Sequence, residues 1–276
     1  MVRISIRRLM LLGCFVCSFN TFAWWDSGHR LVALIAYNNL DSESQRKFNE
    51  LTQTLRRDYP KANLATWPDA IRKHSIEAYT HWHYIDTAYS SDGSATEVSV
   101  DTDNAVWALA QINRVLLDKN VPSSERARFT SFLVHITGDL HQPLHAISRS
   151  NKELPQGDEG GNLFWVKDPM HQESLITLHA LWDSNFGLFK DLSEEQIQRI
   201  AEEITSAYPR DYFSNQELNA LPAVWAQESY SLAKNWVYAT IEKEVPSLEY
   251  QKQSQELIKQ RIALAGYRLA LLLAAS

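Results

Sequence analysis

Residues 132–145 read FLVHITGDLHQPLH and join an apolar helical repeat to three potential metal ligands. The apolar positions that recur at helical spacing here are Phe129, Phe132, Leu133 and Ile136. His135 and Asp139 lie four residues apart, so both side chains leave the same face of the predicted helix. Pro143 cannot continue that helix and lets His145 return from a bend. One His-x3-Asp pair is a weak signal, because surface pairs often have this spacing.

The same spacing returns at His179 and Asp183. Two such pairs and a third histidine after a proline, among only nine histidines, favour a metal centre over surface pairing. Nitrogen and oxygen ligands in this number can hold more than one zinc ion, and the further candidates are His29, Asp69 and His83. The four remaining histidines, His74, His81, His141 and His171, are expected in solvated or core positions. His81 and His141 lie close enough in sequence to candidate ligands to hydrogen-bond and orient them.

The first 23 residues have the pattern of a secretory signal peptide that is cleaved after Ala23. Its basic residues, Arg3, Arg7 and Arg8, precede the apolar run 9–16, which is too short to span a membrane. We therefore expect a secreted or periplasmic protein without stable membrane association, with residues 24–276 as the mature domain. Cleavage after Ala23 would free the amine of Trp24, five residues before His29, as another metal ligand.

Two other processing patterns stay open. A lipoprotein site at Cys14 is less favoured, because it leaves only residues 9–13 as the apolar core and keeps the Trp24 amine inside the chain. Cleavage one residue later would also give an N-terminal tryptophan, Trp25. Cys14 and Cys17 both lie inside the predicted signal, so the mature chain would have no disulfide.

The charge of the mature chain does not favour a nucleic-acid partner by itself. The signal carries three of the 27 basic residues and none of the 33 acidic residues, which leaves a formal charge of −9. Nucleic-acid binding normally rests on Lys and Arg. Bound zinc would change the local charge, since three ions bring six positive charges to the carboxylates around them. The global charge therefore does not decide the substrate.

The mature chain is predicted to be an all-α single domain, mainly helical, with one short β-hairpin. Helices are expected over 29–39, around 106–116 and 129–136, and over 248–273, with capping boxes at residues 42–45 and 193–196. Within residues 151–168, one proline and three glycines are followed by the apolar, aromatic run 163–166, which favours a loop with a strand or hairpin. No repeat or linker divides the chain.

Taken together, these blocks resemble the single-strand-specific zinc nucleases, whose founding members are the fungal nucleases S-one and P-one. Besides residues 132–145, the matching blocks occur in family order and cover nearly all of the mature chain: Trp24-x4-His29, Ala65–Asp69, His83–Asp86, Gly160–Asn162, Leu178–Asp183 and Gly266–Leu269. The resemblance implies a helical fold of the zinc phospholipase C and nuclease P-one type. The chain departs from the family at Trp25, where glycine is usual.

The resemblance also implies three zinc sites. The first would use Asp69, His83, His135 and one oxygen of Asp139. The second would use His145, His179 and Asp183. The third would use the amine and carbonyl of Trp24, His29 and the other oxygen of Asp139, which would bridge two ions.

Further residues would act on the substrate. By resemblance, Arg72 lies beside the scissile phosphate, Tyr84 carries a stacked base, and Asp86 grips the edge of that base; Asn162 is a further candidate for substrate binding. Arg72 follows Asp69 by three residues, which places both on one helix face. Stacking on an aromatic face accepts any unpaired base, whereas a duplex hides the faces of its bases.

The implied activity is hydrolysis of RNA and single-stranded DNA to 5′-phosphorylated products, with loss of phosphate from 3′-nucleotides. Asp69, Arg72 and Asp139 would be catalytic, and no obligatory protein partner is evident. One alternative is a zinc phospholipase C, although that class typically ends its ligand set with His-x3-Glu rather than an aspartate such as Asp183. A second alternative is an exported helical protein with structural zinc, which Asp139 serving two metals does not favour.

Overall fold

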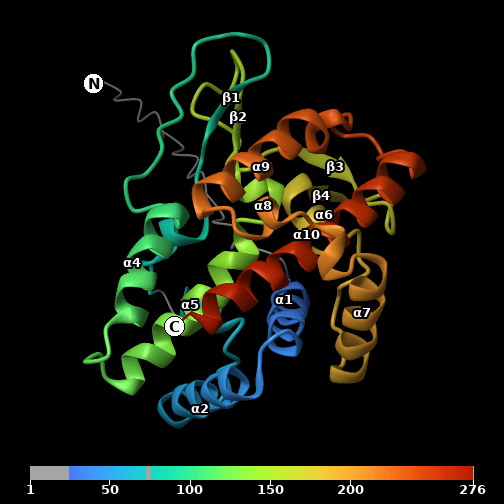
Figure 1. Ribbon diagram of the computed structural model, residues 1–276. Helices are drawn as coiled ribbons and strands as arrows, with labels where there is room; N and C mark the ends of the chain where they lie inside the picture. Colours follow the sequence, from blue (N-terminus) through green and yellow to red (C-terminus); the bar gives the residue numbers. More distant parts are fainter. Residues whose placement is uncertain (1–24, 73–75, 276) are drawn as a thin grey trace, which may run out of the picture.

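The computed structural model describes residues 25–72 and 76–275, and it is mainly helical (Figure 1). Its α-helices are α1 (Asp26–Asn38), α2 (Ser42–Asp58), α3 (Trp67–Arg72), α4 (Ala105–Leu117), α5 (Ser123–Asp139), α6 (Leu178–Asp183), α7 (Glu194–Ala207), α8 (Asn215–Leu218), α9 (Pro222–Asn235) and α10 (Leu248–Ala274). Short 3-10 helices are η1 (Thr80–His83), η2 (Pro143–Ala146), η3 (Arg210–Tyr212) and η4 (Val237–Ala239). The predicted helical class is confirmed. The predicted signal peptide and Trp24 lie outside the described residues, as does His74.

Two small sheets accompany the helices. Strands β3 (Trp165–Lys167) and β4 (Leu175–Thr177) pair antiparallel, which confirms the predicted hairpin. Strands β1 (Ala88–Ser90) and β2 (Ser148–Ser150) pair in parallel and were not predicted. The parallel pair fixes the segment that follows η1 to the segment that follows η2, and both 3-10 helices carry predicted ligands.

The core is built around α1, α5 and α10, which Figure 1 shows crossing near the centre of the molecule. Residues 130–146 are buried without interruption, from the second half of α5 through η2. Gly266 of α10 lies against α1, where a Cβ would stand 2.5 Å from Cγ2 of Ile35. The two helices can approach this closely because glycine has no side chain, and this contact helps to place the buried His29 of α1.

The structure confirms one of the two predicted helix N-caps and corrects the other. Ser193 caps α7 in a capping box with Gln196, as expected. At α2 the prediction of a capping box from Ser42 is wrong, because Asp41 is the N-cap and accepts the backbone N–H of Ser44. The aspartate carboxylate makes the cap one residue earlier and leaves Ser42 as the first helical residue.

Candidate metal centre

Eight of the predicted ligands come together in the interior, from six separate elements. They are contributed by α1, α3, η1, α5, η2 and α6: His29, Asp69, His83, His135, Asp139, His145, His179 and Asp183. Each is at most 4% exposed. Such a concentration of buried carboxylates and imidazoles needs compensation, because an uncompensated buried charge is costly.

Backbone carbonyls fix the orientation of three of the imidazoles. Nδ1 of His135 lies 2.8 Å from the carbonyl oxygen of Ala65. Nδ1 of His145 lies 2.7 Å from the carbonyl oxygen of His83, and Nδ1 of His179 lies 2.7 Å from that of Gly160. A carbonyl oxygen only accepts, so each Nδ1 must carry a proton, and in the neutral form of each ring Nε2 turns its lone pair toward the cluster. This is the arrangement by which metal-bound histidines are usually held.

One group of four ligand atoms has the spacing of a tetrahedral site. Nδ1 of His83 lies 3.1 Å from Oδ2 of Asp139 and 3.7 Å from Oδ1 of Asp69. Nε2 of His135 lies 3.5 Å from each of the same two oxygens and 3.1 Å from Nδ1 of His83. Zinc ligands at bond lengths of about 2.0–2.1 Å stand about 3.3 Å apart in a tetrahedron. These four atoms match that spacing.

A second group lies where η2 meets α6. Nε2 of His145 and Nε2 of His179 are 3.1 Å apart, and Oδ2 of Asp183 is 3.4 Å from the latter. The two imidazoles cannot hydrogen-bond to one another, because both Nε2 atoms present lone pairs. A cation between the two nitrogens would satisfy both and use the adjacent carboxylate, so the residues fit a metal ion.

His29 approaches the first group from α1. Its Nε2 lies 3.3 Å from Oδ1 of Asp139, so the two oxygens of this carboxylate face different histidines. The His29 ring also stacks on the His135 ring at 3.8 Å between centroids. The backbone N–H of Trp25 donates to the carbonyl of Asp183 at 3.2 Å, which ties the start of α1 to the second group. The structure thus brings His29 to Asp139, as the third predicted site requires, whereas Trp24 is outside the described residues.

Several ligand atoms in the described residues have no hydrogen-bond partner although they are buried. They are both ring nitrogens of His29, both oxygens of Asp69, Nε2 of His83 and Oδ1 of Asp139. Such atoms are rare in folded proteins and each normally has a ligand or water. Their concentration here is a second indication that the cluster is built for metal ions.

Burial also shifts the pKa values of these groups. Desolvation raises the pKa of Asp139 and Asp183 well above the usual aspartate range, and it lowers the pKa of His29 and His145 well below that of free histidine. Burial acts in the same direction on His135, but the neighbouring carboxylates outweigh it and raise its pKa to about 9. Neutral imidazoles are the form that metals bind, so a metal ion would displace the additional proton of His135, and its charge would restore the carboxylate form of the aspartates.

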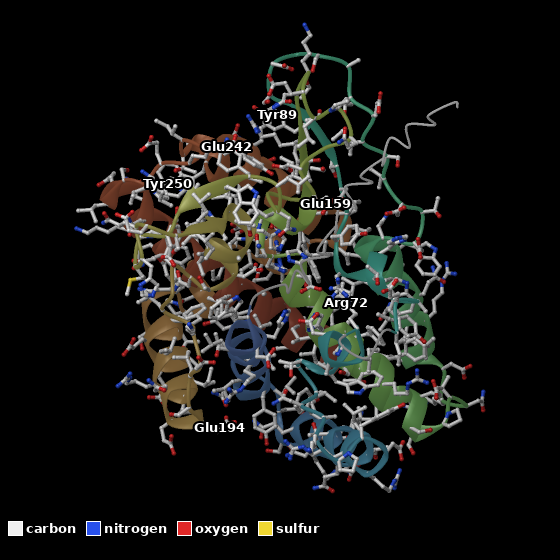
Figure 2. All side chains as sticks on the ribbon, turned by 180° about the vertical axis from the view of Figure 1, so that it is seen from behind. Arg72, Tyr89, Glu159, Glu194, Glu242 and Tyr250 are labelled. Carbon is white, nitrogen blue, oxygen red and sulfur yellow. The ribbon has the colours of Figure 1, made fainter. Side chains whose placement is uncertain are left out.

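A cavity of about 400 Å³ opens from the second group toward solvent. Its lining contains all four predicted substrate residues, namely Arg72, Tyr84, Asp86 and Asn162, together with Thr80, His83, Leu144, His145, Glu159 and His179. Nη1 of Arg72 lies 3.8 Å from Oδ1 of Asp69 on α3. Arg72 and Glu159 project on the same side of the molecule in Figure 2. The structure therefore joins the ligand cluster and the predicted substrate residues in one cleft.

The loop from Asp158 to Asn162 forms one wall of this cavity. The side-chain amide of Asn162 donates to the carbonyl of Glu159 at 2.7 Å, and the next carbonyl, of Gly160, orients His179. Gly160 has a φ of +63°, and a Cβ there would collide with the carbonyl oxygen of Leu144. The glycine is required because the loop backbone must approach η2 closely enough to reach the imidazole of His179.

Sequence reasoning missed two residues of the site. The side-chain amide of Gln142 donates to Oδ1 of Asp183 at 2.6 Å, and Glu159 lines the cavity with its exposed carboxylate. Only the position of Gln142 within the block 132–145 could have signalled it. Of the other histidines, His141 is fully buried, His81 is half-exposed beside Tyr84, and His171 is exposed.

Comparison with known proteins places this chain in a family. Endonuclease 1 of Arabidopsis thaliana is 30% identical to this chain over 98% of the chain and 93% of its own length. Nuclease S1 of Aspergillus oryzae is 26% identical over 91% and 90%, and nuclease P1 of Penicillium citrinum is 27% identical over 58% and 63%. The profile of the S1/P1 nuclease family matches residues 24–276, so the chain belongs to the S1/P1 nuclease family.

Proposed function

We propose that this chain is a zinc-dependent endonuclease that hydrolyses RNA and single-stranded DNA to 5′-phosphorylated products and removes the phosphate of 3′-nucleotides. The family and the buried ligand cluster support this proposal. The observation that carries it is the pair of imidazole nitrogens of His145 and His179, held 3.1 Å apart with lone pairs facing beside a substrate-sized cavity.

We propose three zinc ions. The first set is Asp69, His83, His135 and Oδ2 of Asp139; the second is His145, His179 and Asp183; the third is His29, Oδ1 of Asp139 and the amine and carbonyl of Trp24. Bound zinc supplies Lewis acidity and makes water a nucleophile near neutral pH. Asp139 would serve two of the sites, one through each carboxylate oxygen. Asp69 would hold a zinc ion and also accept a hydrogen bond from the attacking water.

The residues of the cavity act on the substrate. The guanidinium of Arg72 is held by Asp69 at the edge of the ligand cluster, where it stabilises negative charge that develops on phosphorus oxygens. Tyr84 offers its ring to an unpaired base, and the side chains of Asp86 and Asn162 hydrogen-bond the edge of that base. A duplex cannot present a base face to Tyr84, so this role of the ring is consistent with the proposed action on single strands.

We also propose that the protein is exported and that the mature domain spans 24–276 after cleavage behind Ala23. Among the described residues, no helix has the length and hydropathy that a membrane crossing requires. N-terminal sequencing of the exported protein tests the cleavage point directly. A terminus at Trp25 or at Cys14 would remove the Trp24 amine from the third zinc site.

One experiment on the purified mature protein tests the activity. Zinc content is measured by elemental analysis, and turnover is measured on single-stranded DNA, the matching duplex and phosphatidylcholine. We expect about three zinc ions and much faster hydrolysis of the single strand. Asp139→Asn should abolish turnover and lower the zinc content while the helical circular dichroism is kept, whereas exposed Asp58→Asn should match the wild type. Fewer than two zinc ions at saturation, or faster turnover of the lipid, contradicts the proposal.

A further inference from the structure

The turn that links α5 to η2 presents two side chains in different directions. Gln142 belongs to the metal cluster, since its amide donates to Asp183 and its oxygen accepts the backbone N–H of Leu144 at 2.6 Å. His141 instead contacts helix α10. Its Nδ1 donates to the carbonyl of Thr137 at 2.7 Å, so its Nε2 is the acceptor for Nη1 of Arg268 at 2.8 Å.

Behind His141 lies an ion cluster made of the buried Arg261 and Arg268 from α10 and the partly exposed Glu228 from α9. Arg268 makes two hydrogen bonds of 2.8 Å to Glu228, and Arg261 makes one of 3.0 Å. Arg268 also donates twice to the carbonyl of Glu217, at 3.0 and 2.8 Å. Arg268 is 1% exposed and Arg261 is 5% exposed. The guanidinium groups therefore have few alternative partners, and water cannot easily replace the ones they have.

The same cluster holds the backbone of the turn. Arg261 donates from Nε to the carbonyl of His141 at 3.2 Å and from Nη2 to the hydroxyl of Ser229 at 3.0 Å. That hydroxyl donates to the carbonyl of Leu140 at 2.5 Å. Carbonyls at the end of a helix lack intrahelical partners, and cationic donors are favourable there. The end of α5 is thus fixed by a charge-assisted hydrogen bond from Arg261 of α10 and by a hydroxyl hydrogen bond from Ser229 of α9.

The fixed segment is flanked by metal ligands. Asp139 precedes Leu140 directly, and His145 follows within the 3-10 helix that Gln142 caps. An ion pair with buried guanidiniums is weak support for stability, because desolvation offsets much of its attraction. A geometrical role explains better why three charged side chains meet behind this turn.

We propose that Arg261, Arg268 and Glu228 act as a clamp on the metal centre, working through His141 to hold Asp139 and His145 at ligand spacing. His141 and the three charged residues are positioning residues, since none of them touches substrate or metal. The inference rests on the proposed zinc-dependent function and extends it to residues outside the cleft.

The test compares His141→Phe with His141→Gln in the mature, zinc-loaded protein. Phenylalanine removes the acceptor for Arg268, whereas glutamine keeps an acceptor oxygen. The readouts are the rate of zinc transfer to a chromogenic chelator, and kcat and KM on a single-stranded oligonucleotide. All are taken at a temperature at which the circular dichroism of the variants equals that of the wild type.

We expect His141→Phe to release zinc at least tenfold faster and to lower kcat with little change in KM, because the cavity residues are untouched. His141→Gln should restore both quantities to within about threefold of the wild type. Glu228→Gln, which removes only the charge, should also speed zinc release. The control is Glu256→Gln, which breaks the exposed 2.7 Å pair with Lys259 on the same helix and should change neither readout.

The outcomes separate the two proposals. If His141→Phe and Glu228→Gln melt at lower temperature but release zinc and turn over substrate as the wild type does, the network is only structural and the clamp is overturned. If His141→Phe does not fold, Glu228→Gln decides the question by the same readouts. A wild-type protein that holds no zinc overturns the proposed function and the clamp together.

Discussion

At the residue scale, Tyr84 offers the clearest test of how the cleft selects unpaired strands. The phenol lies in the cavity lining with its ring half-buried and in an edge contact with the ring of His81. Stacking of one base on an aromatic ring contributes about 1–3 kcal/mol. We expect Tyr84→Ala to raise KM for single-stranded oligonucleotides about tenfold or more and Tyr84→Phe to leave KM nearly unchanged. Steady-state kinetics with unchanged KM in the alanine variant would exclude stacking on this ring.

The carboxyl of Asp86 should have an unusually high pKa in the metal-free protein. Burial, followed by the charges of Asp158, Asp101 and Glu159, raises its pKa to about 7. A carboxyl with a raised pKa is neutral and can donate a hydrogen bond below that pH, and it only accepts above it. Zinc loading adds positive charge nearby and should lower this pKa, so that metal binding releases a proton from Asp86.

This behaviour can be measured by carbon NMR of the aspartate carboxyls. Glu159→Gln removes one negative neighbour, so it favours the ionised form and should lower the pKa of Asp86. Lys152→Gln serves as a control, since Lys152 is exposed and belongs to the Asp92 turn. A pKa that stays or rises in Glu159→Gln would show that the glutamate charge does not reach Asp86.

The clustering of the candidate ligands could be predicted from sequence because metal chemistry limits the residue types and helix geometry limits their spacing. His135 and Asp139 illustrate this, since their spacing of four residues on α5 brings Nε2 of one to 3.5 Å from Oδ2 of the other. Gln142 and Glu159 could not be predicted in the same way. Their roles depend on which elements meet in space, and neither residue type nor spacing encodes the approach of α6 or of the loop before β3.

At the element scale, replacing Gly266 by alanine has two opposing effects on stability. Alanine is favoured over glycine inside a helix by about 1 kcal/mol. At this position, however, a Cβ would stand 2.5 Å and 2.7 Å from two atoms of Ile35 on α1. Overpacking of this kind costs about 1–3 kcal/mol, so Gly266→Ala should destabilise the fold.

Denaturant unfolding of the zinc-free protein shows whether Gly266→Ala lowers or raises the free energy of unfolding. Without zinc, the effect of packing is separated from that of metal binding. The exposed site Gln253→Ala on the same helix is the control and should have little effect. A more stable Gly266→Ala protein would mean that α1 can move away from α10 without loss. Since α1 carries His29, that movement should also weaken zinc binding in the third proposed site.

The helices were more predictable than the strands. Helix α10 has nearly the predicted bounds because 27 residues of periodic apolar sequence leave little choice. The parallel pair β1–β2 has three residues in each strand and joins positions about 60 residues apart in the sequence. No local sequence pattern therefore indicates it. At α2 the cap differs from the prediction because Asp41 and Ser42 are both good N-cap residues. Which of them caps the helix depends on where the packed helix begins, and the local sequence does not specify this.

At the scale of the whole molecule, zinc removal should cost much of the stability. The cluster gathers buried ligands from six elements between α1 and α6, and without cations its aspartates and histidines face one another. A ligand at a thousand times its Kd stabilises a fold by about 4 kcal/mol. For a chain of this size we expect chelation to lower Tm by about 10 °C or more, as measured by thermal circular dichroism. Calcium added instead of zinc should not restore it, and equal Tm values with and without chelator would argue against a structural contribution of the metal.

The packing of α1 against α10 also bears on when the centre can form. Every proposed side-chain ligand has been synthesised once Asp183 has left the ribosome, but the helix that seats α1 ends at Ala274. A nascent chain therefore carries all of these donor side chains long before it can enclose them. Closure by the final segment delays the active state until translation is finished, and a chain truncated before α10 would hold its metals loosely and remain inert.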